Sequence, residues 1–123
     1  MKVTPRWLRR VGAVALLVVL APAPTAASTL WGYGVNSCEK FLDAAAGFER
    51  GDQTDEYRRY REWLAGFISG VNLATGQDVL RGAELEAALV RIAADCRGEP
   101  RMDFFNAAMG FVRFLMRLDD GRS

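Results

Sequence analysis

The chain contains no histidine. It therefore cannot form a Ser-His-Asp triad or a Cys-His nucleophile pair, and it lacks the commonest side-chain ligand of transition metals. Histidine is also the side chain that ordinarily changes charge near neutral pH. Any response to acid must come from carboxylates at clearly lower pH. We expect no metal site and no cofactor.

The chain also lacks a strand pattern, an internal repeat and a low-complexity tract. Its 123 residues suffice for one domain. Acidic residues are present, but Asp52, Asp55 and Glu56 lie where a helix is predicted to start, and capping explains them there. A glycosidase needs one carboxyl group in an apolar cleft beside another that stays ionised. The sequence thus predicts a protein that is not an enzyme, with a carboxylate-based hydrolase as the enzymatic alternative.

The first 27 residues have the pattern of a signal peptide. Basic residues at 2, 6, 9 and 10 precede the apolar run 11–21, and small residues follow two prolines. This order, ending in a cut after Ala27, is typical of a cleavable secretory signal. The run is about half the roughly 20 residues that a membrane helix needs. We expect a periplasmic or secreted protein whose single domain spans residues 28–123.

Charge argues against a nucleic-acid partner. Cleavage at residue 27 leaves 12 basic and 15 acidic residues, a net charge of −3. The segment Tyr57-Arg58-Arg59-Tyr60-Arg61 interleaves aromatic and basic side chains, as single-strand binders do. On a helix, however, its tyrosines join the apolar face and its arginines point outward, with Asp55 and Arg59 paired at i,i+4.

The two cysteines, Cys38 and Cys96, both lie in the exported part. Two cysteines in an oxidising compartment predict one disulfide. This bond closes a loop of roughly sixty residues and is worth roughly 4 kcal/mol on the loop-entropy model.

Apolar periodicity predicts an all-α fold, a bundle of about four helices at roughly 37–50, 55–73, 83–96 and 100–118. Asn36 and Thr54 are the expected N-caps of the first two helices, and Pro100 is the expected first residue of the fourth. Residues 72–78 are polar and predict a loop. Gly66 and Gly70 predict close approach of a neighbouring helix, and Trp31-Gly32-Tyr33-Gly34 predicts a lid over the bundle.

The fourth helix has an unusually wide apolar face. At about 100° per residue its apolar side chains cover an arc of roughly 220°, against a little over 100° for an ordinary surface helix. The members of this arc are Phe104, Phe105, Ala108, Met109, Phe111, Val112, Phe114, Leu115, Met116 and Leu118. Either the helix is central in the bundle, or Phe111, Phe114 and Leu118 form a protein-binding face or a homodimer contact.

The run Cys38-Glu39-Lys40-Phe41-Leu42 resembles the opening Cys-acid-x-Phe-Leu motif of the HdeA/HdeB family of small periplasmic acid-stress chaperones. Cys96, a short turn and an aromatic last helix extend the resemblance over about residues 31–118. It implies a disulfide-closed helical bundle that binds unfolded clients through apolar surface exposed by acid. The segment Trp63-x-x-Gly66-x-x-x-Gly70 looks closer to exported immunity proteins that neutralise type VI secretion toxins.

These observations lead to two functional hypotheses for a non-enzymatic, protein-binding module. The first is an acid-stress chaperone for unfolded clients. The second is an immunity or inhibitor protein that neutralises one specific secreted toxin.

Overall fold

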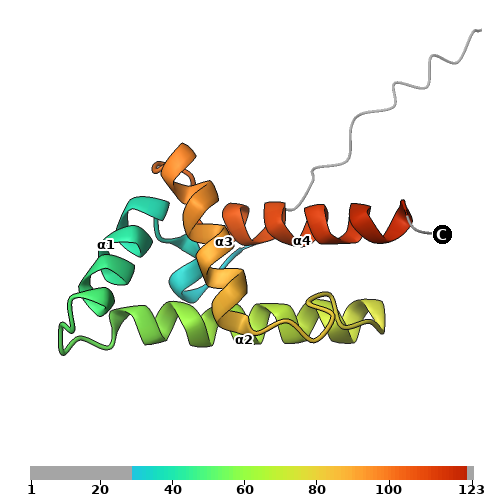
Figure 1. Cartoon of the computed structure of the whole chain (residues 1–123), viewed down its shortest axis with the longest axis horizontal. Helices are drawn as coiled ribbons and strands as arrows, with labels where there is room; N and C mark the ends of the chain where they lie inside the picture. Colours follow the sequence, from blue (N-terminus) through green and yellow to red (C-terminus); the bar gives the residue numbers. More distant parts are fainter. Residues whose placement is uncertain (1–28, 122–123) are drawn as a thin grey trace, which may run out of the picture.

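The computed structural model describes residues 29–121, and the predicted signal peptide lies outside this range. A short 3-10 helix, η2 (Gly32–Val35), precedes α1 (Cys38–Glu49), α2 (Glu56–Thr75), α3 (Leu85–Gly98) and α4 (Phe104–Asp120). In Figure 1, α2 and α4 run along the length of the molecule, α3 lies across them, and α1 stands at one end. The prediction of a small all-α bundle is confirmed, and no strand occurs within residues 29–121.

The predicted disulfide joins Cys38, the first residue of α1, to Cys96 in the last turn of α3. Both cysteines are fully buried. The bond therefore ties α1 to α3 through two cysteines that are 58 residues apart in the sequence.

The start of α1 is completed by the segment between α3 and α4. The first N–H groups of a helix have no partner within it. Here the N–H of Cys38 donates to the Met102 carbonyl at 2.7 Å, and that of Glu39 donates to the Pro100 carbonyl at 2.9 Å. The Asn36 carbonyl in turn accepts from the Phe104 N–H at 2.8 Å. The starts of α1 and α4 therefore hold each other in place beside the disulfide.

This junction shows why two expected helix starts are wrong. Ser37, not Asn36, caps α1, because the Asn36 backbone is used for the contact with α4. Pro100 does not open α4: it lies in the preceding turn, and Asp103 caps that helix by accepting from the Asn106 N–H at 2.7 Å.

The second helix departs from its expected start and end. It follows Asp55 rather than Thr54, and the Asp55 side chain makes no capping hydrogen bond. At the other end α2 runs through residues 72–75 of the predicted loop and stops at Gly76, whose φ of +68° suits glycine, so that only residues 76–78 of that loop lie outside the helix. The Asn72 side chain links the end of α2 to the following turn, since its Oδ1 accepts from the Val79 N–H at 3.0 Å.

The core is aromatic at its centre. The Phe104 ring lies 4.6 Å from that of Phe41, 5.1 Å from that of Tyr60 and 5.6 Å from that of Trp63, measured between centroids. Phe41 and Phe104 are fully buried, and Tyr60 nearly so. Aromatic side chains from α1, α2 and α4 therefore meet at a single point. No buried polar or charged residue occurs within residues 29–121.

The segment before α1 packs on α2, partly as the predicted lid. The Trp63 indole N–H donates to the Trp31 carbonyl at 3.0 Å. A Cβ on Gly34 would lie only 2.1 Å from the Trp63 ring, so glycine permits this contact. Trp31 itself is 80% exposed, so it adds little to this cover.

The expected close approach at Gly66 and Gly70 is wrong. A Cβ at either position would meet nothing within 4 Å, because both glycines lie on the outer side of α2. Nothing in the structure explains why glycine occupies these two helical positions, where it costs about 1 kcal/mol each relative to alanine.

Candidate functional site

The wide apolar arc of α4 is core along its first half and surface along its second. Phe104, Ala108, Phe111 and Val112 are buried. Phe114, Met116 and Leu118 are 39%, 42% and 42% exposed. The helix is therefore central where α3 crosses it, as one interpretation predicted, and it carries exposed apolar side chains beyond that point (Figure 1).

The three residues proposed as a protein-binding face lie in different environments. Phe111 is 8% exposed and belongs to the core, so little of it can contact a partner. Phe114 lies under the Arg91 guanidinium, 5.4 Å from its ring centroid, and Leu118 is one turn further on. The accessible part of the predicted face is therefore Phe114 and Leu118, with Met116 on another side of the helix.

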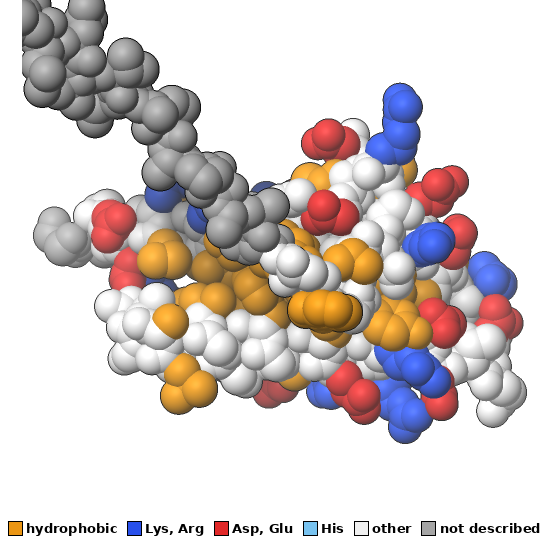
Figure 2. Space-filling model, turned by 180° about the vertical axis from the view of Figure 1, so that it is seen from behind, with side chains coloured by type: hydrophobic (Ala, Val, Ile, Leu, Met, Phe, Trp, Pro, Cys, Tyr) orange, Lys and Arg blue, Asp and Glu red, His pale blue; other side chains and the backbone are white. Residues whose placement is uncertain are grey.

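Apolar side chains also gather between α2 and α4 on the opposite side of the molecule, as Figure 2 shows. Phe67 stacks on Trp63 with centroids 5.4 Å apart, and Phe105 meets the Phe67 ring edge-on at 5.6 Å. These rings fill the space between the two helices. We therefore interpret this band as the partly exposed edge of the core.

A groove that the sequence did not reveal lies between α1, α2 and α3. It has a volume of about 180 Å³. Its lining residues come from all three helices: Phe41, Ala45, Phe48, Glu49, Tyr57, Leu89, Val90, Ala93 and Arg97. Phe48 is 60% exposed and Val90 69% exposed, although Phe48 follows the buried Cys38 and Phe41 at the helical spacing of the core face. The groove will be called the α1–α3 groove.

The aromatic wall of the α1–α3 groove is held by a chain of contacts. Phe48 stacks on Tyr57 with ring centroids 4.6 Å apart. The Tyr57 hydroxyl donates to a carboxylate oxygen of Glu86 on α3 at 3.0 Å, and the other oxygen accepts from the Arg61 guanidinium. Burial, and next the hydrogen bond to Glu86, raise the pKa of Tyr57 to about 12. The Tyr57–Glu86 contact thus joins α2 to α3 beside the groove.

This raised pKa predicts a loss of stability in alkali. Because the folded pKa of about 12 exceeds the ordinary value near 10, folding favours the neutral phenol. That stabilisation is complete below about pH 10 and is lost as the pH rises through about 12. A spectrophotometric tyrosinate titration should show a late component that Tyr57→Phe reduces; part of it should remain, because burial also raises the pKa of Tyr60.

Glu86→Gln provides the mechanistic test of that titration, because it deletes the carboxylate while keeping the side-chain size. It should move the late component towards pH 10. Glu62→Gln changes an exposed carboxylate on α2 that has no such contact and should have no effect. A wild-type titration complete near pH 10 would contradict the expected shift.

A second depression, of about 380 Å³, lies beside the loop between α1 and α2. It brings together the carboxylates of Asp43, Asp52 and Glu56, of which only the last two belong to the acidic cluster seen in the sequence. All three are exposed. Asp52 pairs with Arg50 at 3.1 Å, and Glu56 accepts from the Tyr33 hydroxyl at 3.2 Å. These acids lack the apolar surroundings that a general-acid carboxyl group requires.

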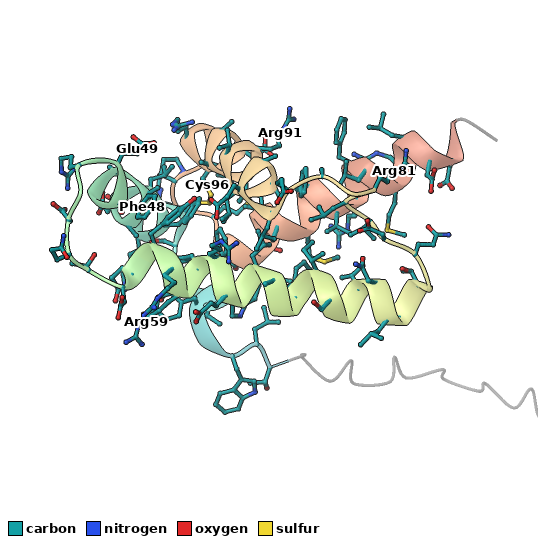
Figure 3. All side chains as sticks on the ribbon, turned by 60° about the horizontal axis from the view of Figure 1, so that its bottom comes forward. Phe48, Glu49, Arg59, Arg81, Arg91 and Cys96 are labelled. Carbon is teal, nitrogen blue, oxygen red and sulfur yellow. A yellow bond between two sulfur atoms is a disulfide. The ribbon has the colours of Figure 1, made fainter. Side chains whose placement is uncertain are left out.

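The ion pair expected between Asp55 and Arg59 is replaced by another. Asp55 contacts Arg58 at 2.9 Å rather than Arg59. Figure 3 shows Arg59 on the outer side of α2.

Among residues 29–121 there is no cluster of three or more acidic or cysteine side chains suited to a metal ion. None of the described helices is long and apolar enough to span a bilayer.

Comparison with known proteins adds no relative. No family model matches the chain, and no curated protein or solved structure matches it. The class of the molecule is therefore the one that its own structure defines: an all-α bundle closed by a Cys38–Cys96 disulfide.

Proposed function

We propose that this chain is an exported, non-enzymatic protein-binding module that acts as an acid-stress chaperone for unfolded clients. The observation that carries the proposal is the distribution of charge. Carboxylates take part in several of the side-chain links between elements at the surface, whereas the described core contains no buried polar or charged residue.

Three such links join separate elements. Glu86 on α3 binds Tyr57 and Arg61 of α2. Asp119 near the end of α4 pairs with Arg81 in the loop before α3. Glu56 of α2 accepts from the hydroxyl of Tyr33 in η2.

Acid would weaken these links and spare the centre of the bundle. Aspartate and glutamate ordinarily titrate near pH 4, and a protonated carboxyl group no longer attracts a guanidinium. The aromatic core and the Cys38–Cys96 disulfide carry no charge that acid can change. The helices would therefore loosen at their edges while the chain stays compact. Apolar surface near Phe114 and Leu118 would then grow and become available to unfolded chains.

A pH titration of the mature, oxidised protein tests this function. We expect ANS fluorescence to rise at about pH 2–3 with little change in size by light scattering. In the same range the protein should suppress aggregation of an acid-unfolded client. A protein that stays silent to ANS and inactive towards the client in acid would overturn the proposal.

Glu86→Gln sharpens the test, because it imitates protonation of one link at neutral pH. The variant should begin to bind ANS at higher pH than the wild type. Glu62→Gln, on the exposed side of α2, is the matched control and should titrate as the wild type does. Equal midpoints for all three proteins would remove Glu86 from the mechanism.

The α1–α3 groove supports a second candidate function, that of an immunity or inhibitor protein for one cognate toxin. A groove whose wall is already ordered at neutral pH suits a single partner with a complementary surface. Tight, stoichiometric binding of one secreted toxin at neutral pH, with inhibition of its activity, would support this candidate.

A further inference from the structure

The α1–α3 groove has the size of one side chain. Pockets for drug-sized ligands usually measure about 300–1,000 Å³, and this groove measures about 180 Å³. An apolar cavity of roughly 150 Å³ holds a benzene ring. The groove therefore matches a phenyl or isobutyl group, and a larger ligand would place only one such group inside it.

The floor and one side of the groove are apolar and are arranged before any partner arrives. Phe48, stacked on Tyr57, forms one side, and Leu89 and Ala93 of α3 lie buried beneath. The Tyr57 hydroxyl is fixed by Glu86. Large apolar side chains held at a mouth that is exposed to water lose little conformational freedom on binding, which favours association.

The rim carries one charge of each sign. Glu49 stands at the end of α1, next to Phe48 (Figure 3), and Arg97 stands at the end of α3. Neither residue joins an ion pair within residues 29–121. A partner would therefore gain from a basic residue on the Glu49 side and an acidic residue on the Arg97 side. Such rim pairs contribute orientation more than affinity.

We propose that the α1–α3 groove is a docking site for a polypeptide partner that inserts one phenylalanine-sized side chain between a basic and an acidic residue. The inserted side chain covers the exposed faces of Phe48 and Val90, and the flanking charges pair with Glu49 and Arg97. This inference concerns the folded protein at neutral pH and rests on no acid-induced change. It can therefore fail while the chaperone function holds, and the reverse.

The test uses capped peptides and the complete mature, oxidised protein at neutral pH. The probe is Gly-Lys-Phe-Asp-Gly, and the control peptide Gly-Lys-Ala-Asp-Gly lacks only the aromatic ring. Amide chemical shifts are followed during titration. We expect the probe to perturb Phe48, Tyr57 and Val90, with the control peptide at least about tenfold weaker, a difference of about 1.4 kcal/mol.

Two alanines of α1 provide matched variants. Ala45 lines the groove and Ala46 is an exposed neighbour outside it. Ala45→Phe should fill the groove and weaken the probe at least about tenfold, whereas Ala46→Phe should leave its affinity unchanged. Val90→Glu, at a side chain that is 69% exposed, should weaken the probe similarly without disturbing the core. Absence of shifts at the groove, equal binding of both peptides, or unchanged affinity in Ala45→Phe and Val90→Glu would overturn the docking site.

Discussion

Replacing both cysteines with alanine is expected to lower the free energy of unfolding by about 4 kcal/mol. The reason is the loop of 58 residues that the Cys38–Cys96 bond closes, which restricts the unfolded chain. A domain of this size is stabilised by roughly 5–15 kcal/mol in total. The melting temperature should fall by roughly 20 °C, since about 1 kcal/mol corresponds to some 4–8 °C in a small domain.

The bond also reinforces the junction where α1 and α4 begin. Cys38 contributes its N–H to the Met102 carbonyl as well as its sulfur to Cys96. Urea unfolding of the oxidised wild type and of Cys38→Ala/Cys96→Ala measures the difference in their free energies of unfolding. Reduced wild-type protein serves as the control, because it keeps the sulfur volume in the core and lacks only the covalent link. A loss below about 1 kcal/mol in both would contradict the loop-closure estimate.

Phe104→Ala is expected to cost about 3–5 kcal/mol, the usual range for removing a buried phenylalanine ring. Phe104 is fully buried and contacts the rings of Phe41, Tyr60 and Trp63. Its removal would leave a cavity where α1, α2 and α4 meet. The collapse needed to fill it is opposed by the hydrogen bond between the Phe104 N–H and the Asn36 carbonyl.

The effect of burial is isolated by comparing the free energies of unfolding of Phe104→Ala and Phe48→Ala in denaturant. Phe48 is 60% exposed and stacks only on Tyr57 among aromatic rings of the described residues. Its replacement should cost about 1 kcal/mol, mostly through the lost ring contact. Phe104→Leu keeps most of the volume and should fall between the two. Equal losses for Phe104→Ala and Phe48→Ala would show that the ring junction is not the centre of the core.

The sequence predicted most accurately those features that depend on local interactions or that allow only one pairing. Helix periodicity arises from neighbours three and four residues apart, so the four helices appeared close to their observed places. The Cys38–Cys96 pairing followed from there being only two cysteines. Periodicity predicted less well which side chains of a helix are buried, as Phe48 shows. It keeps the spacing of the core face but lies beyond the point where α3 covers α1.

The sequence by itself determined the helical class, the approximate extent of each helix and the disulfide, because periodicity and a single cysteine pair are properties of the chain. Tertiary structure decided the rest. Ser37 and Asp103 became caps because the backbone of Asn36 and Pro100 was already bonded across the junction. The α4 arc divided into core and surface because α3 crosses only part of it. The α1–α3 groove exists because three helices separated in sequence meet around Tyr57, a relation that depends on packing geometry.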